Sequence, residues 1–100
     1  MCVFFRTTEF DEWLKALRDP IGKARILARV RAAELGHFGD CAPVGDGVFE
    51  LRIHVGPGYR VYYWRHGAVT YWLLCGGDKS TQRRDIGKAK ALRIRVENEA

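Results

Sequence analysis

Cysteine is scarce in this chain, and the few cysteines present are widely spaced. There are three, Cys2, Cys41 and Cys75, and three dispersed histidines, His37, His54 and His66. An odd cysteine count without paired spacing argues against a disulfide framework and is typical of a reducing cytosol. Structural zinc needs four ligands in clustered spacing, which this sequence lacks. We therefore expect no disulfide, no metal and no cofactor.

Long hydrophobic runs are missing as well. No apolar segment approaches the roughly 20 residues that a membrane-spanning helix needs. The N-terminal segment contains Arg6 and Glu9, and it is too short and too soon charged for a secretory signal peptide. These absences predict a soluble, cytoplasmic protein without a membrane partner.

Acidic residues are outnumbered by basic ones. Seventeen Lys and Arg against twelve Asp and Glu give a net charge of +5, and the isoelectric point is about 9.4. Such a surface on a small domain attracts polyanions. Charge alone does not distinguish RNA, DNA, an acidic protein or an anionic membrane. Hydrophobic residues make up 47% of the chain, which is enough for one core, so residues 1–100 are interpreted as a single domain.

The hydrophobic periodicity changes once along the chain. It is helical after a short first strand, and from Asp40 it alternates as in strands. Asp19-Pro20 is a helix start and Asp46-Gly47 a hairpin turn. The expected elements are a strand over 1–6, two helices between Thr8 and Gly36, strands on both sides of Asp46-Gly47, strands over 59–65 and 68–75, and a last helix from Ser80. The order β-α-α-β-β-β-β-α predicts an α+β fold with a mostly antiparallel sheet.

A polar face is expected on the two central strands. We interpret Gly56-Pro57-Gly58 as a three-residue loop, and residues directly opposite one another in the two strands then share a face. The pairs on one face are His54 with Arg60, Arg52 with Tyr62, and Glu50 with Trp64. Arginines, a carboxylate, an imidazole and aromatic rings together predict a surface that stacks bases and binds phosphates. The alternative is the solvated polar face of a half-exposed sheet.

Two further segments are candidate anion sites. Gly76-Gly77 ends the predicted sheet and precedes Lys79, so backbone N–H groups and a helix N-terminus could approach a phosphate there. The alternative, which the residues alone favour, is a plain turn with Ser80 as the N-cap. The last helix carries a basic face with Arg83 and Arg84. It follows a nucleic-acid backbone, docks an acidic partner segment, or is simply solvated.

Three segments, in order, resemble the HigB-like addiction-module killer proteins of the RelE/ParE superfamily. They are Gly47 to Ile53, Gly56 to Tyr63, and Leu73 to Gln82 with Arg84-Asp85-Ile86 and Ala89. Phe10 to Leu14 and Gly36 to Asp40 fit the same pattern, so the resemblance covers nearly the whole chain. It implies the RelE fold, a small curved, mostly antiparallel sheet with two N-terminal helices and a C-terminal helix.

The resemblance also implies a function. Such proteins are toxins of type II toxin–antitoxin systems, and RelE-type members cleave mRNA without a metal, often in the ribosomal A site. The substrate's own 2′-hydroxyl attacks the adjacent phosphate and leaves a 2′,3′-cyclic phosphate. The implied partners are mRNA, the ribosome and a cognate antitoxin encoded by an adjacent gene, which is expected to carry a helix-turn-helix.

The implied roles fall on residues that match these motifs. Arg52 and Arg60 would bind the phosphate and the transition state with Lys79 as a further cation, and Glu50 or His54 would be the base. The implied RNA-binding residues are Tyr62, Trp64, Arg83 and Arg84. The last helix lacks the tyrosine or histidine that some relatives use, which leaves the base and the acid open. Two alternatives remain: a ParE-like protein that inhibits gyrase without cleaving nucleic acid, and a basic domain that only binds its antitoxin.

Overall fold

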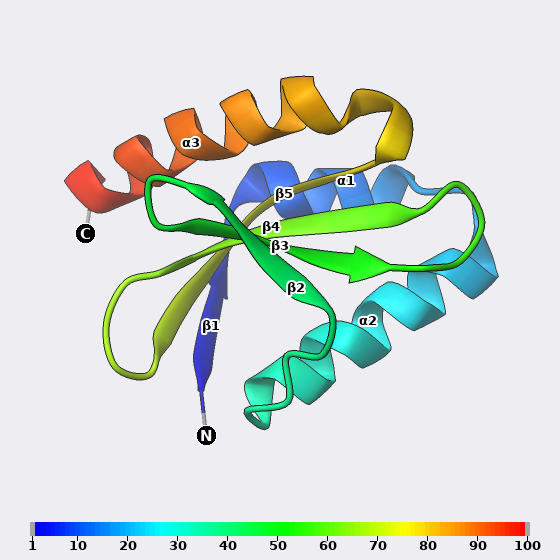
Figure 1. The fold of residues 1–100 in the computed structure, drawn as a ribbon, viewed down its shortest axis with the longest axis horizontal. Helices are drawn as coiled ribbons and strands as arrows, with labels where there is room; N and C mark the ends of the chain where they lie inside the picture. The colour runs from blue at the N-terminus through cyan, green and yellow to red at the C-terminus, as the bar shows by residue number, and fades with distance from the viewer. Residues whose placement is uncertain (1, 100) are drawn as a thin grey trace.

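The computed structural model describes residues 2–99 and contains five strands and three α-helices (Figure 1). The strands are β1 (Val3–Arg6), β2 (Cys41–Gly45), β3 (Val48–Ile53), β4 (Tyr59–Arg65) and β5 (Thr70–Asp78). The helices are α1 (Thr8–Ala16), α2 (Pro20–Glu34) and α3 (Gln82–Glu99), and a 3₁₀ turn, η1 (Lys79–Thr81), precedes α3. The predicted element order and the α+β class are confirmed.

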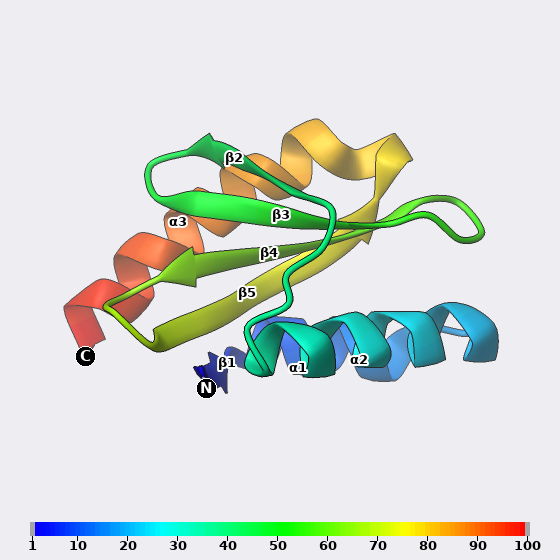
Figure 2. The same ribbon diagram turned by 60° about the horizontal axis from the view of Figure 1, so that its bottom comes forward.

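All five strands belong to one sheet, in the order β1-β5-β4-β3-β2 (Figure 2). Neighbouring strands are antiparallel except for β1, which lies parallel to β5. The mostly antiparallel sheet that the sequence predicts is therefore confirmed. Strands β1 and β2 form its two edges.

Local side-chain chemistry sets two of the predicted boundaries. Asp19 caps α2, and Pro20 is the first helical residue, where its missing N–H costs no hydrogen bond. Asp46 and Gly47 join β2 to β3 with φ angles of 56° and 77°. These left-handed angles suit a tight two-residue hairpin turn, so both predictions are confirmed.

Helices cover both faces of the sheet. In Figures 1 and 2, α1 and α2 lie on one face and α3 lies across the other. The core on the first face includes Phe10, Ile26, Leu51, Val61 and Leu73. The core on the second face includes Tyr62, Trp64, Leu74, Ala89, Leu92 and Val96. Within residues 2–99, none of the helices has the length and apolar character needed to cross a membrane.

The expectation that the polar face of β3 and β4 is open to solvent is wrong. Tyr62 is fully buried and Trp64 is 6% exposed, because α3 lies over them. The apolar side of α3 needs an apolar partner, and these two rings supply much of it on that face. Both are therefore core residues, and neither ring is open to stack on a base.

The predicted register between β3 and β4 is off by two residues. Arg52 lies opposite Arg60, rather than opposite Tyr62. The connecting loop spans residues 54–58 instead of three, and two of its glycines adopt φ angles of 55° and 81°. A shift by two keeps the strand side chains on their predicted face, because side chains alternate with a period of two. His54 lies in the loop, directly after the end of β3.

Gly76-Gly77 does not end the sheet, contrary to prediction. Strand β5 continues through both glycines to Asp78. The glycines allow close packing: a Cβ on Gly76 would lie 2.3 Å from the Trp13 ring, and one on Gly77 would lie 1.8 Å from Oδ2 of Asp85. The carboxylate of Asp78 accepts a hydrogen bond from the backbone N–H of Ser80 at 2.8 Å, so Asp78 caps the following turn. The predicted anion cradle and the predicted serine N-cap are both wrong.

Candidate active site

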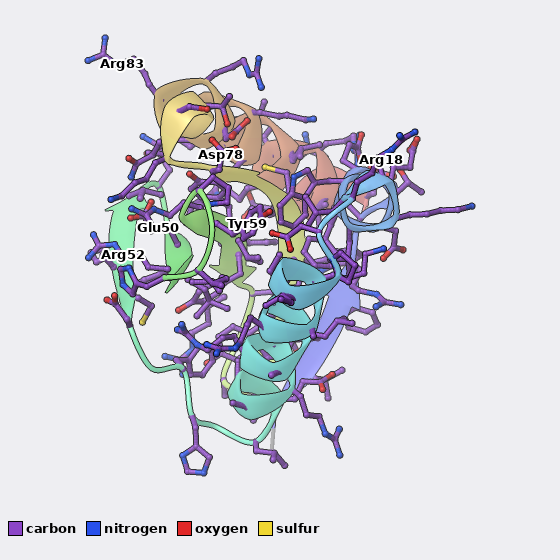
Figure 3. The ribbon with its side chains drawn as sticks, turned by 90° about the vertical axis from the view of Figure 1, so that its right-hand side faces the viewer. Arg18, Glu50, Arg52, Tyr59, Asp78 and Arg83 are labelled. Carbon is purple, nitrogen blue, oxygen red and sulfur yellow. The ribbon has the colours of Figure 1, made fainter. Side chains whose placement is uncertain are left out.

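A buried carboxylate organises the polar end of β3 and β4. Glu50 is 1% exposed, and its Oε2 accepts a hydrogen bond from Nε of Arg52 at 2.8 Å. Nε2 of Gln82, the first residue of α3, donates to Oε1 of Glu50 at 3.0 Å. Figure 3 shows Glu50 and Arg52 side by side at this end of the sheet. Glu50 is thus enclosed by β3 and α3, and it orients Arg52.

Arg60 lies deeper than Arg52, on the neighbouring strand. It is 6% exposed, and its Nε is 3.9 Å from Oε2 of Glu50. Its Nε and Nη1 have no hydrogen-bond partner among residues 2–99. A buried guanidinium needs a compensating charge, and Glu50 supplies it. Arg60 therefore adds positive charge beneath the surface, while Arg52 presents a partly exposed guanidinium above it.

An imidazole–carboxylate pair lies beside Arg52. Nε2 of His54 is 2.5 Å from Oδ2 of Asp40, and Nη1 of Arg52 is 3.7 Å from Oδ1 of the same carboxylate. The hydrogen bond from His54, followed by the charge of Arg52, holds the pKa of Asp40 below its usual value, against the raising effect of partial burial. A carboxylate can only accept, so His54 donates to Asp40 through Nε2, and Nδ1 takes no part in this contact.

A hollow of about 250 Å³ opens next to this pair. It is lined by His54 with the rest of the loop, Val55, Gly56, Pro57 and Gly58, and by Lys79. The aliphatic part of Lys79 runs along Gly58, where a Cβ would lie 3.1 Å from Cδ of the lysine. The loop that carries His54 and the turn that carries Lys79 therefore form the two sides of one opening. A larger hollow of about 450 Å³, between Trp72 and the C-terminal half of α3, lies away from these groups.

Five of the residues predicted to form the site come together, and four do not. Glu50, Arg52, Arg60, His54 and Lys79 surround the end of β3 and β4. Tyr62 and Trp64 are buried beneath α3, and the guanidinium of Arg93 lies 5.5 Å from the Trp64 ring. Arg83 and Arg84 are exposed on the first turn of α3, and Figure 3 shows Arg83 pointing away from Glu50 and Arg52.

Two polar residues of the site were missed by sequence reasoning. Asp40 and His54, which form a hydrogen bond, are 14 residues apart in the sequence, and Gln82 and Glu50 are 32 residues apart. Neither separation is a motif spacing, so no local pattern could have predicted these contacts. Among residues 2–99, no group of three or more His, Cys, Asp or Glu side chains is placed to hold a metal ion.

This fold and site define a basic α+β protein with an exposed imidazole and cationic side chains at one end of its sheet. Residues 12–96 match the family described as phage-derived Gp49-like proteins (DUF891), and the chain belongs to that family. The family is a toxin-like one, associated with toxin–antitoxin systems. A relative from Haemophilus influenzae, described as an uncharacterized protein, is 50% identical over 93 residues, which is 92% of this chain and 94% of the relative.

Proposed function

We propose that this protein is the toxin of a type II toxin–antitoxin pair, similar to HigB, and that it cleaves mRNA without a metal. One observation carries the proposal: His54, oriented by Asp40, stands beside Arg52 and faces a hollow that Lys79 also lines. An imidazole that can take a proton, next to cations that can bind a phosphate, is what cleavage by a 2′-hydroxyl requires. The family's association with toxins supports the same conclusion.

The residues divide the chemistry between them. Nδ1 of His54 removes the proton of the 2′-hydroxyl, whose oxygen forms a bond to the adjacent phosphorus while the bond to the 5′-oxygen breaks. Arg52 and Lys79 bind the phosphate as its negative charge grows, and buried Arg60 adds to the positive potential. Lys79 donates the proton that the leaving 5′-oxygen takes up. The products are a 2′,3′-cyclic phosphate and a 5′-hydroxyl end.

Glu50 has a different part in this proposal. Its carboxylate is 1% exposed and accepts hydrogen bonds from Arg52 and Gln82, so no 2′-hydroxyl can reach it. Of the two bases that the sequence left open, the geometry therefore favours His54. Glu50 is a positioning residue that fixes the Arg52 guanidinium.

The proposed partners follow from the toxin role. The proposed substrate is mRNA, bound free or on the ribosome, where Arg83 and Arg84 add exposed positive charge on α3 for a nucleic-acid backbone. The proposed antitoxin is the product of an adjacent gene, with a helix-turn-helix and an acidic segment that complements the net charge of +5.

The test is induced expression in a bacterial host, with mapping of transcript 5′ ends and chemical identification of the new 3′ ends. Wild type is expected to arrest growth and to leave discrete cuts ending in 2′,3′-cyclic phosphate. His54→Gln should reduce cleavage by about 10²–10⁴-fold, the usual effect of losing a general base. Arg52→Ala should reduce it by a comparable factor, because one transition-state hydrogen-bond donor is worth about 10²–10³-fold.

Matched controls keep the residue type and change the location. His37→Gln removes an exposed histidine that lies after α2, and Arg18→Ala removes an exposed arginine that Figure 3 places on the opposite side from Arg52. Both controls should cleave like wild type. Growth arrest with intact transcripts would move the conclusion to gyrase inhibition, and no arrest would leave a domain that only binds its antitoxin.

A further inference from the structure

Arg29 of α2 binds three backbone carbonyl oxygens at the candidate active site. Its Nη1 donates to the carbonyl of Arg52 at 2.5 Å, and its Nη2 donates to the carbonyls of Phe38 at 2.9 Å and Asp40 at 3.0 Å. The backbone N–H of Arg52 donates to the carbonyl of Asp40 at 3.0 Å. One guanidinium therefore joins α2 to the two segments that carry Asp40 and Arg52.

The loop before β2 is shaped around this guanidinium. Gly39 has a φ of 67°, and a Cβ there would lie 3.1 Å from Nη2 of Arg29. Only a residue without a side chain allows the backbone to curve this closely around the arginine. No carboxylate among residues 2–99 lies within ion-pair distance of Arg29, so its donors serve backbone carbonyls alone.

We propose that Arg29 is the positioning residue of the active site, and that its three carbonyl contacts hold the Asp40 carboxylate against His54 and Arg52. This inference rests on the proposed function, in which His54 is the base and Asp40 orients it. The planar guanidinium suits the task, because its donors diverge in fixed directions and can bind two chain segments at once. Lysine, with one flexible ammonium group, cannot hold both segments in one geometry.

The ionisable groups that face Asp40 come from three places. Arg29 approaches from α2, Arg52 from β3, and His54 from the loop after β3, while Glu50 reaches Asp40 only through Arg52. The hydrogen bond from His54 is the main cause of the lowered pKa of Asp40. Loss of that hydrogen bond should therefore raise the pKa of Asp40 toward its ordinary value. A measured pKa of Asp40 thus shows whether its carboxylate still lies against His54.

The experiment replaces Arg29 by lysine and follows Asp40 by carboxyl ¹³C NMR titration. Arg29→Lys keeps the positive charge on α2, so a raised pKa of Asp40 reports a lost position rather than a lost charge. Cleavage by Arg29→Lys should fall about 10–100-fold, since small misplacements of a catalytic group cost factors of this size. Arg25→Lys, at an exposed position one turn earlier in α2, is the matched control and should change neither quantity.

A second variant tests the same contact from the other side. Gly39→Ala adds a methyl group 3.1 Å from Nη2 of Arg29, and it should raise the pKa of Asp40 in the same way if it remains folded. Folded Arg29→Lys and Gly39→Ala proteins that titrate like wild type at Asp40 overturn the inference, whether or not wild type cleaves RNA. If wild type does not cleave RNA, the proposed function fails, and the titration still decides whether Arg29 positions Asp40.

Discussion

The packing of α3 against the sheet can be tested most directly at Gly77. It lies in β5 opposite Arg60, and a Cβ there would be 1.8 Å from Oδ2 of Asp85, at the start of α3. Asp85 is 4% exposed, and its Oδ2 accepts a hydrogen bond from Oγ1 of Thr81 at 2.5 Å. Gly77→Ala must therefore displace either the strand or a buried carboxylate with its partner.

The expected cost has two parts. Overpacking a well-packed site costs about 1–3 kcal/mol. Disturbing a buried hydrogen bond to a charged group costs about 1.5–3 kcal/mol more. We therefore expect Gly77→Ala to lose about 2.5–6 kcal/mol of the free energy of unfolding, which lowers Tm by about 10 °C or more in a chain of this length.

Gly87 supplies the matched control within α3. Apart from its neighbours in the chain and the backbone of its own helical turns, no atom of the described residues lies within 4 Å of a Cβ placed on Gly87. Gly87→Ala should therefore stabilise the protein by up to about 1 kcal/mol, the helix-propensity difference between the two residues. Urea unfolding, followed by tryptophan fluorescence and helical circular dichroism, measures both changes. A Gly77→Ala protein as stable as wild type would refute the packing argument.

Two further predictions concern ionisable and hydroxyl groups outside the active site. The hydrogen bond from Arg95 lowers the pKa of Glu9 to about 2, so the pair stabilises the fold above the usual glutamate range and this stabilisation is lost as the pH falls toward 2. Glu9→Gln should lose about 1 kcal/mol at pH 7, as expected of a partly exposed pair, and urea unfolding should show a smaller difference from wild type at pH 3. Tyr59→Phe should lower the free energy of unfolding by about 1.5–3 kcal/mol, because the Tyr59 hydroxyl donates a hydrogen bond to Asp19 at 2.6 Å. Tyr62→Phe should leave the free energy of unfolding unchanged or raise it, because the buried Tyr62 hydroxyl has no hydrogen-bond partner among residues 2–99. Equal losses in the two tyrosine variants would contradict this reasoning.

Local chemistry made much of the fold predictable. Asp19-Pro20 starts a helix and Asp46-Gly47 turns a hairpin for reasons contained in those residues alone. The alternation along β3 and β4 also put Glu50 and Arg52 on one face, and this assignment survived a register error of two residues. The sequence did not predict that α3 covers part of that face of the sheet.

The burial of Tyr62 and Trp64 could not be predicted from the strand pattern. Aromatic rings beside arginines suit a base-stacking surface, and they equally suit a core with a charged rim. The difference is made by α3, whose apolar side packs onto these rings. An amphipathic pattern shows that a helix is covered on one side, but it does not show by which surface.

The candidate site was predictable in its strand residues and not in their supports. Arg52 and Arg60 could be placed on one face of a single hairpin, although not opposite one another. Asp40 and Arg29 come from segments that only the tertiary fold brings to the site. Arg29 contacts the carbonyl of Arg52 across 23 residues, through a side chain that looks like any exposed helical arginine. Every residue type has a backbone carbonyl, so the sequence does not show which residues an arginine such as Arg29 will bind.

The parallel pairing of β1 with β5 has a consequence for synthesis of the chain. The hydrogen bond from Oγ1 of Thr7 to the carbonyl of Leu74 spans 67 residues, so β1 leaves the ribosome long before its partner exists. Closing a loop of that length costs about 4 kcal/mol of chain entropy, which only the completed sheet and its covering helices offset. A nascent chain that stops before Thr70 has both N-terminal helices but neither β5 nor α3, and it therefore lacks Gln82, which contacts Glu50 from α3. Newly made protein can acquire an ordered site only after β5 and α3 have left the ribosome.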